Sequence, residues 1–414
     1  MRDKFQGFYQ PNGEEIKAAW EDKGTLFVFD TSTLLNIYSY AEQTRTDFFN
    51  ILEKLQDQIW LPYHVGLEYQ RRRLEVIKEE KNIFLKIHNC LKKIEKVFES
   101  DFKKLSLKKR FPELYKETKE LHEKIALAID SYSARVKEWD SKQPCVRSHD
   151  VIRERLTTIF AGKVGCIPSQ AWLDNIYEEG KQRFENKVPP GYMDYGPKKD
   201  ITFSYAGLLY KSAFSDLIIW KQIIQEARKE GIKVVIFITD DGKEDWLYII
   251  NSRGKKKIGP RAELREEIYR EASVNFFIIY NTADFLEAGR SILEVAVQES
   301  SIQDANTIFQ RNLAELYNER LDRQIQNNWS NYLTNLSAIN LDKFKIDEQF
   351  KANLSKYFNN KYFNQLNKID FEKIWIDFLN NYKAQLNNDL KNYILHKETN
   401  LRNDDDNDES DENE

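Results

Sequence analysis

Short apolar runs alternate along the chain with amphipathic stretches, a pattern typical of strands separated by helices. Four runs are rich in β-branched or aromatic residues: 26–30, 58–61, 234–239 and 275–280. Each is too short for a helix and has the length of a buried strand. Residues 213–229, just before the third run, show helical spacing of apolar residues. Because helices separate the strands, we predict an α/β fold with a parallel sheet between two helical layers, three layers in all.

A long helical insertion interrupts this alternation between residues 74 and 140. Apolar residues recur there at spacings of three, four and seven, with a break near residues 110–112 and many Lys and Glu between them. This pattern predicts an antiparallel helical hairpin that projects from the sheet. Its Lys-rich stretches could contact phosphates, but the interleaved Glu favours a solvated helix face.

The same patterns divide the chain into four predicted parts. Residues 1–73 and 141–295 form one discontinuous α/β domain, interrupted by the hairpin over residues 74–140. Residues 296–402 show helical periodicity only and are predicted to be a C-terminal helical region. Residues 403–414 hold eight acids and no base, a composition that predicts a disordered acidic tail.

Two irregular segments beside the predicted sheet bear on function. Residues 188–199 are rich in Pro and Gly, and we predict an ordered loop or lid there. A helix is expected through Trp246 and Ile250, followed by the basic loop SRGKKKIGPR over residues 252–261. A basic loop beside an acidic strand end is a candidate phosphate contact, although an ordinary exposed turn has the same composition.

Composition says more about the compartment than about the substrate. The formal net charge is −4, and without the eight acids of the last twelve residues it is about +4, so charge neither excludes nor indicates an anionic substrate. Cys90, Cys145 and Cys166 are odd in number and lack a metal-binding spacing, which favours reduced thiols. The N-terminus lacks a signal peptide, and no apolar run approaches the ~20 residues that span a bilayer. We therefore expect a cytoplasmic protein with no membrane partner.

Carboxylates gather where the predicted strands end. Asp30 follows the first strand, and Asp240 and Asp241 follow the third, with Glu244 and Asp245 one turn later. The carboxyl ends of parallel strands meet at one edge of the sheet, which is where ligands bind in such folds. Each acid alone could cap a helix. Together they repel one another unless a cation binds between them, so we expect a shared metal site.

Two further acids, Glu68 and Asp216, are expected near the starts of helices that would reach the same edge. Glu68 could instead form a surface ion pair with the arginines at 71–73. Oxygen ligands without His or Cys favour hard cations, so we expect Mg²⁺ or Mn²⁺. Such an ion acidifies a water and stabilises the charged oxygens of a phosphodiester, which is nuclease chemistry. The candidate ligands are Asp30, Glu68, Asp216, Asp240, Asp241 and Asp245, and the candidate phosphate contacts are Arg183, Lys198, Arg253, Lys255, Lys256, Lys257 and Arg261.

Four segments together resemble the PIN domain superfamily and, more narrowly, a group of bacterial PIN-like domains. They are VFDTSTLLN (28–36), LPYHVGLEYQRR (61–72), FSDLIIW (214–220) and FITDDGKEDW (237–246). The resemblance covers residues 20–290, with the hairpin as an insertion. It implies a three-layer PIN-like fold and a metal-dependent endonuclease. The catalytic residues that it implies, as holders of Mg²⁺, are Asp30, Glu68, Asp216 and Asp241.

The resemblance also implies a single-stranded nucleic-acid substrate, RNA more often than DNA. Relatives of this kind occur in bacterial toxin and antiphage defence systems. Ser215 is a departure, because a glycine often precedes the third acid. The Thr-x-Asp spacing favours Asp241 over Asp240 as the fourth ligand and leaves Asp240 behind it. The alternative is an inactive PIN-like scaffold whose helical regions bind a protein partner or a second copy of the chain; the presence of all four acids argues against it.

Overall fold

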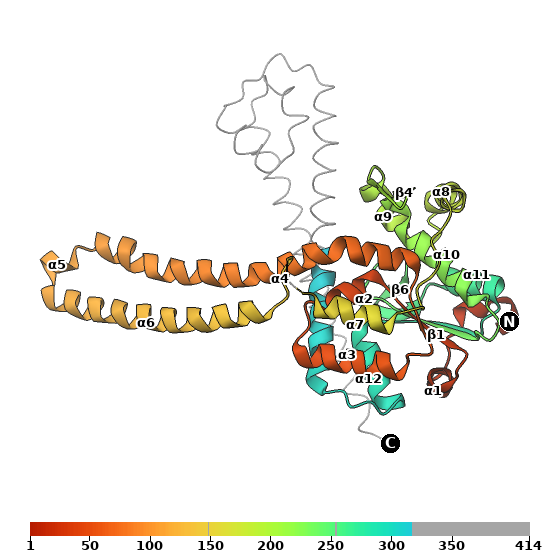
Figure 1. Cartoon of the computed structure of the whole chain (residues 1–414), viewed down its shortest axis with the longest axis horizontal. Coiled ribbons are helices and arrows are strands. Elements are labelled where there is room, and N and C mark those ends of the chain that lie inside the picture. The colour runs from red at the N-terminus through yellow and green to blue at the C-terminus, as the bar shows by residue number, and fades with distance from the viewer. Residues whose placement is uncertain (148, 253–254, 317–414) are drawn as a thin grey trace, which may run out of the picture. The chain divides into compact units, whose positions relative to one another are not determined.

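The computed structural model describes residues 1–147, 149–252 and 255–316, and its centre is a parallel sheet (Figure 1). Four strands lie in the order β2-β1-β5-β8: β1 (Thr25–Phe29), β2 (Ile59–Trp60), β5 (Val234–Ile238) and β8 (Phe276–Tyr280). Strands β1 and β5 are neighbours, paired in parallel from Thr25 opposite Val234 to Phe29 opposite Ile238. The predicted parallel sheet is therefore confirmed, with its strands where the apolar runs placed them.

Helices cover both faces of the sheet. Every residue of β1 and β5 is buried, as expected for strands covered on both sides. On one face, the Phe29 ring packs against Phe48 and Phe285, at centroid distances of 6.1 and 5.5 Å. On the other, Phe277 packs against Trp220 at 5.1 Å. Phe48 and Phe285 belong to α3 (Glu42–Lys54) and α12 (Thr282–Ile292), and Trp220 belongs to α10 (Ser215–Ala227). With α1 (Gly13–Glu21) on the first side and α11 (Ala262–Ala272) on the second, the helices and the sheet form the three predicted layers.

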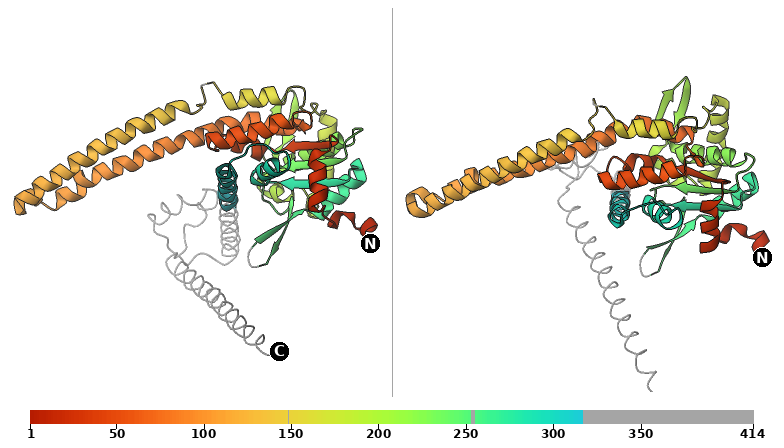
Figure 2. Two further views of the ribbon diagram at one scale, coloured as in Figure 1. Left: turned by 90° about the horizontal axis from the view of Figure 1, so that it is seen from below. Right: turned by 60° about the horizontal axis from the view of Figure 1, so that its bottom comes forward.

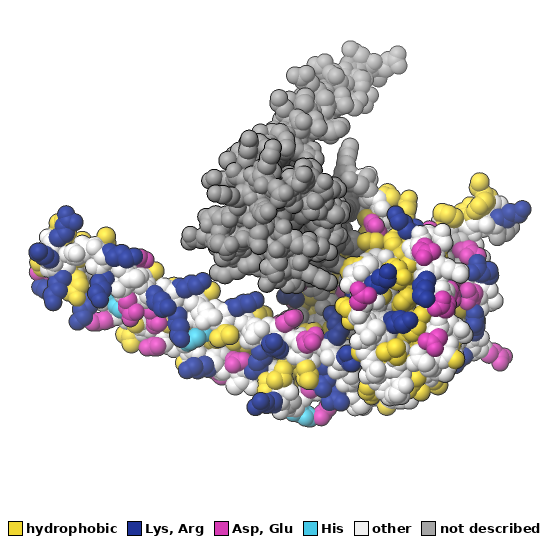
Figure 3. All heavy atoms as spheres, turned by 90° about the horizontal axis from the view of Figure 1, so that it is seen from above, with side chains coloured by type: hydrophobic (Ala, Val, Ile, Leu, Met, Phe, Trp, Pro, Cys, Tyr) yellow, Lys and Arg dark blue, Asp and Glu magenta, His cyan; other side chains and the backbone are white. Residues whose placement is uncertain are grey.

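The predicted hairpin is formed by two long helices, α4 (Tyr63–Val97) and α6 (Pro112–Lys142). They are joined through a π-helical turn (η3, Phe98–Phe102) and α5 (Leu107–Arg110). Figures 1 and 2 show the pair extending far beyond the sheet, and Figure 3 shows Lys and Arg interspersed with Asp and Glu along it. That mixture of charges is typical of a solvated surface. The hairpin belongs with the sheet to one compact unit, Met1–Ala314.

Several short elements complete the unit and place side chains near the sheet edge. They are α2 (Thr31–Asn36), α7 (Val151–Ile159), α8 (Gln170–Glu185), α9 (Tyr192–Lys198), β3 (Thr202–Tyr205) and β4 (Leu208–Lys211). Strands β3 and β4 form a two-stranded antiparallel ribbon that the apolar pattern did not predict. The predicted lid is partly helical, because α9 occupies its second half.

The segment after β5 differs from the expected helix and basic loop. It forms a second antiparallel ribbon, β6 (Leu247–Asn251) paired with β7 (Lys255–Pro260). Trp246 begins the ribbon and is buried, with its ring 5.0 Å from that of Phe237. A short apolar run such as 247–250 does not distinguish helix from strand by period alone. The helix prediction is therefore wrong, and pairing with β7 decides the structure of this segment.

Residues 299–316 are helical, in agreement with the predicted C-terminal helical region as far as the described chain extends. The rest of that region, 317–402, and the acidic tail at 403–414 lie outside the described residues. No helix in the part of the chain that the structure describes combines the length and apolarity needed to cross a bilayer.

Candidate functional site

The carboxyl ends of β1 and β5 bring Asp30 next to Thr239 and Asp241. The Asp30 backbone N–H donates to the carbonyl of Ile238, 2.9 Å away, which continues the parallel ladder past the strand end. The Asp30 carboxylate then accepts hydrogen bonds from the hydroxyls of Ser32 (2.6 Å) and Thr239 (2.8 Å). Burial raises the pKa of Asp30, and the nearby Asp241 and Glu68 carboxylates add to that rise against the opposing hydroxyls. Asp30 is thus held in one orientation at a crowded acidic edge.

Glu68, in the second turn of α4, points to the same edge and not to the arginines that follow it. Its Oε2 accepts a hydrogen bond from Thr31 Oγ1 at 3.0 Å, so the residue after Asp30 orients it. His64, one turn earlier, lies with Nε2 3.0 Å from Ser215 Oγ and 3.9 Å from Glu68 Oε1. Burial lowers the pKa of His64, so its imidazole is neutral near pH 7. The alternative of a surface ion pair for Glu68 is therefore not what the structure shows.

Asp216, the second residue of α10, contributes a buried carboxylate oxygen whose ion-pair partner is the Lys243 ammonium, 3.8 Å away. Its Oδ2 is buried and makes no hydrogen bond in the described residues. Burial raises the pKa of Asp216 well above its ordinary value, although the Lys243 ammonium opposes the rise. The lid lies directly against this residue: a Cβ built on Gly191 would lie 3.2 Å from the Asp216 Cβ. Gly191 also has φ +96°, a conformation that favours glycine.

A lysine that the sequence did not single out, Lys243, lies between the acids. Its Nζ is 2.6 Å from Asp241 Oδ2, 3.1 Å from Asp194 Oδ2 and 3.8 Å from Asp216 Oδ2. Burial alone would lower the pKa of Lys243, but these carboxylates outweigh it and raise the pKa well above its ordinary value. The half-buried Lys198 binds Asp194 as well, at 2.5 Å. The sheet edge therefore carries a cluster of acids around the Lys243 ammonium. We call this cluster the acidic pocket; its acids are Asp30, Glu68, Asp194, Asp216 and Asp241.

These residues match a hard divalent cation in donor type and in charge. The carboxylates offer oxygen ligands only, one buried oxygen of Asp216 makes no hydrogen bond in the described residues, and an ammonium lies among three of the acids. Their spacing is not that of a closed ligand set: among the described residues, no three Asp, Glu, His or Cys side chains lie in an arrangement that would hold one ion. The site fits the ion by chemistry, with Lys243 at its centre.

Asp240, the other candidate for the fourth ligand, faces away from this pocket. It accepts hydrogen bonds from Asn36 Nδ2 at 2.7 Å and from the backbone N–H and hydroxyl of Thr282 at 2.9 and 2.8 Å. Tyr40 donates a further bond at 3.2 Å. With both oxygens engaged, Asp240 fastens the end of β5 to the start of α12. The structure thus places Asp241 in the pocket and corrects the expectation of a ligand role for Asp240.

Asp245, one of the predicted ligands, contacts the lid, and Glu244, expected at the border of the site, lies beside it in the chain. Asp245 Oδ2 accepts the backbone N–H groups of Gly191 (3.0 Å) and Met193 (3.2 Å), so it anchors the lid, while its buried Oδ1 has no hydrogen bond in the described residues. Burial, with a further contribution from Asp241, raises the pKa of Asp245 to about 6. Glu244 is exposed. Asp245 consequently positions the lid beside Asp216.

Residues 26–264 match the family described as PIN like domain, which is more than half of the chain. The chain belongs to the PIN-like domain family. The match runs from β1 into α11 and includes all four implied catalytic acids, with the hairpin inside it. No curated protein and no solved structure matches the chain. A PIN-like domain is typically a nuclease fold, which implies a hydrolase acting on nucleic acid.

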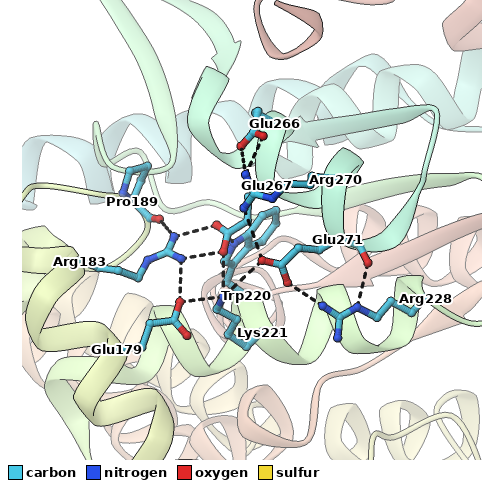
Figure 4. Close-up of polar contacts among 10 residues, drawn as sticks. All are labelled: Glu179, Arg183, Pro189, Trp220, Lys221, Arg228, Glu266, Glu267, Arg270 and Glu271. Atoms are coloured by element: carbon cyan, nitrogen blue, oxygen red, sulfur yellow. Dashed lines mark hydrogen bonds and ion pairs between the residues drawn. The ribbon is translucent and has the colours of Figure 1, made fainter. Parts of the chain in front are cut away.

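In this PIN-like domain, Arg183 is not available to a substrate. Its guanidinium binds both oxygens of Glu267, at 2.7 and 2.8 Å, and Glu179 at 3.1 Å (Figure 4). Trp220 Nε1 and Lys221 Nζ donate to the same Glu267, each at 2.8 Å. Arg183 therefore ties α8 to α11 beneath the surface, and the expectation of a phosphate contact is corrected.

The other predicted phosphate contacts of the PIN-like domain differ in their surroundings. Lys198 lies at the acidic pocket, as described above. Arg261 pairs with Glu263 at 2.7 Å, and Lys257 lies over the Phe309 ring with Nζ 3.5 Å from its centroid. Lys256 is exposed on β7. Arg253 lies outside the described residues, and Lys255 is described only by its place in β7.

Proposed function

We propose that this protein is a metal-dependent endonuclease that hydrolyses phosphodiester bonds in single-stranded nucleic acid, RNA in preference to DNA. The observation that carries the proposal is the acidic pocket at the strand ends. Asp30 interacts electrostatically with Glu68 and Asp241, and Asp216 with Asp241, so the four acids influence one another. A scaffold that only bound protein would have no use for such mutual repulsion.

In this proposal Asp30, Glu68, Asp216 and Asp241 hold Mg²⁺ or Mn²⁺. The ion supplies positive charge that acidifies a water and stabilises the charged oxygens of the phosphodiester. The protein orients the ligands: the hydroxyls of Ser32 and Thr239 hold the Asp30 carboxylate, and the hydroxyl of Thr31 holds Glu68. Because burial raises the pKa of Asp30 and Asp216, a cation beside them favours their ionised form, and these two acids favour a positively charged occupant.

The lid lysine Lys198 and the central Lys243 have a second part in the proposal. Both ammonium groups contact Asp194, at 2.5 and 3.1 Å, so one carboxylate from α9 holds two positive charges at the site. Charge-assisted bonds to phosphate oxygens are the interactions that such groups form most strongly. We assign Lys198 and Lys243 to the phosphate backbone of the substrate, with Asp194 as the residue that positions them.

The preference for RNA and a role in bacterial toxin or antiphage defence rest on the resemblance of the motifs to known bacterial PIN-like domains. The hairpin of α4 and α6 is proposed as the surface for a partner protein or a second copy of the chain. Apolar side chains such as Leu85 and Leu127 are exposed on it, which supports that assignment. In the alternative, an inactive protein-binding scaffold would use the same hairpin, and the four acids would have no catalytic function.

The test is cleavage of single-stranded RNA and DNA in Mn²⁺, comparing wild type with Asp30→Asn and Asp216→Asn. Each variant keeps size and hydrogen-bonding capacity but loses a unit of ligand charge, so we expect cleavage to fall by at least a hundredfold with folding retained. Glu244→Gln is the matched control, because Glu244 is an exposed acid three residues after Asp241. It should cleave like wild type. Equal activity in all four proteins, or none in wild type, would contradict the nuclease assignment.

A further inference from the structure

A cavity of about 550 Å³ lies beside the turn of α4 that carries Glu68. Its walls come from four parts of the chain: α2, the start of α4, the segment from α7 to residue 164, and the β3–β4 ribbon. Most of its lining is apolar, including Leu34, Leu67, Leu156 and Phe160. The volume is in the range of ~300–1,000 Å³ that holds small organic groups in proteins. No residue of the acidic pocket lines it, so it is a separate binding surface.

The cavity adjoins the acidic pocket along two helices. Leu67 of its wall immediately precedes Glu68 on α4, and Leu34 lies one turn after Asp30 on α2. The hydrogen bond from Thr31 to Glu68 joins these two helices. A ligand that fills the cavity therefore places its neighbouring groups close to Asp30 and Glu68.

Three tyrosines line the cavity, and two of them, Tyr63 and Tyr205, lie near each other. Tyr63 begins α4, and Tyr205 ends β3 with 52% of its surface exposed. The two lie close enough to interact, since burial and then the proximity of Tyr205 raise the pKa of Tyr63. Exposed aromatic side chains next to a groove are the surfaces on which unpaired bases stack. Aliphatic peptide side chains would need no such planar walls.

Two arginines at the rim supply positive charge that nothing in the described chain neutralises. Arg71 and Arg153 both line the cavity, and the Arg71 guanidinium stacks on Phe203 with its carbon 3.8 Å from the ring centroid. Within the described residues no carboxylate oxygen lies within 4.0 Å of either guanidinium. Asp150 accepts the backbone N–H of Arg153 at 3.0 Å, but its ion pair is with Arg73, at 3.1 Å. Positive charge beside aromatic walls complements a nucleotide, which has both a phosphate and a planar base.

We infer that this cavity binds one unstacked base of a single-stranded nucleic acid, next to the bond that is cleaved. The inference rests on the proposed function and names its substrate more closely. The base fills the apolar cavity between Tyr63 and Tyr205, and Arg71 and Arg153 hold the adjoining backbone. A base paired in a duplex cannot enter without unstacking and unpairing, which costs several kcal/mol, so the cavity selects single strands.

The experiment measures binding of fluorescein-labelled single-stranded 12-mers by the Asp216→Asn protein, in which cleavage is suppressed, in Mg²⁺. Tyr205→Ala is added to remove one wall. Tyr248→Ala is the matched control, because Tyr248 is 50% exposed on the other two-stranded ribbon and outside the cavity. Loss of one stacked base corresponds to a fall in affinity of roughly tenfold. We expect that fall for Tyr205→Ala, and less than a twofold change for Tyr248→Ala.

A set of 12-mers, each with one abasic site at a different position, then locates the bound base. We expect one position to weaken binding by the Asp216→Asn protein, and Tyr205→Ala to lose sensitivity at that position only. Equal affinities for Tyr205→Ala and Tyr248→Ala, or uniform tolerance of abasic sites, would overturn the base-binding assignment. If wild type does not cleave while the abasic pattern is as expected, the cavity assignment stands and the nuclease assignment falls. If wild type cleaves but the pattern is absent, the reverse holds.

Discussion

Replacing Lys243 with methionine removes one positive charge from the acidic pocket while keeping side-chain length. In the metal-free protein the ammonium contacts Asp241 at 2.6 Å and Asp194 at 3.1 Å, with 11% of the lysine side chain exposed. Removing one partner of a buried ion pair costs about 3–5 kcal/mol, because the remaining charges are left without compensation. We therefore expect Lys243→Met to lower the free energy of unfolding by about 3 kcal/mol in the absence of divalent ions.

The same substitution should strengthen metal binding. An ammonium and a divalent ion compete for the same carboxylates, and two unit charges about 4 Å apart interact by about 4 kcal/mol at an effective dielectric constant near 20. Because the flexible lysine can turn away when an ion binds, only part of that repulsion persists. We expect the repulsion removed by the substitution to strengthen Mn²⁺ binding by at least about 1.4 kcal/mol, which corresponds to a tenfold lower Kd. The metal-free variant should thus be less stable than wild type and recover more stability when Mn²⁺ is added.

The assay combines calorimetric titration with Mn²⁺ and thermal unfolding with and without the ion. Lys221→Met is the control, since Lys221 is equally buried (14% exposed) and is paired with Glu179 and Glu267 at 2.8 Å, away from the pocket (Figure 4). It should lose stability without any change in the Kd for Mn²⁺. Equal Kd values for wild type and Lys243→Met, or a weaker one for Lys243→Met, would refute the competition between lysine and metal.

Three further outcomes follow from the same contacts. The metal-free protein should become more stable as the pH falls from 7 to about 5. Burial raises the pKa of Asp216, and that of Asp245 to about 6, so the native state binds protons that the unfolded chain releases. Saturating Mn²⁺ should abolish this gain in thermal unfolding, and a gain unchanged by Mn²⁺ would count against the shared site. Gly191→Ala should destabilise the fold by about 1–2 kcal/mol in urea titrations, because Gly191 has a positive φ and lies close to Asp216. The control Gly196→Ala should be neutral, because the space around Gly196 is open. Equal effects of the two substitutions would contradict the lid geometry. Arg183→Met should cost about 3 kcal/mol of stability through loss of the Glu267 pair and leave cleavage per folded molecule unchanged, so a selective loss of cleavage would return Arg183 to the substrate surface.

The sheet and the position of its acidic edge could be predicted because both depend on local pattern. Each strand is a continuous apolar run, β1 ends directly before Asp30, and only Thr239 separates the end of β5 from Asp240, so the parallel arrangement alone brings the acids together. Neighbouring residues at a strand end face different directions, however. Sequence left Asp240 and Asp241 open for that reason, and the hydrogen bonds of Asp240 with Asn36 and Thr282 decide between them.

What could not be predicted depends on contacts between distant segments. In the sequence Lys243 is an ordinary charged residue, because its partners Asp194 and Asp216 belong to other elements and contact it only in the folded chain. Arg183 reads as a free cation because its partner Glu267 is 84 residues away. The base cavity is likewise assembled from four separate segments. In each case the residues were visible in the sequence, but the partners that determine their roles come together only in the folded chain.

The measurement that tests the central claim most directly is the anomalous diffraction of crystals grown with Mn²⁺, recorded at the manganese absorption edge. We expect one strong peak within bonding distance of Asp216 Oδ2, which makes no hydrogen bond in the described residues, shared with Asp30, Glu68 and Asp241, and a Lys243 ammonium moved away from it. A pocket without a peak, with Lys243 still bound to Asp241 at saturating Mn²⁺, would contradict the metal-dependent nuclease site.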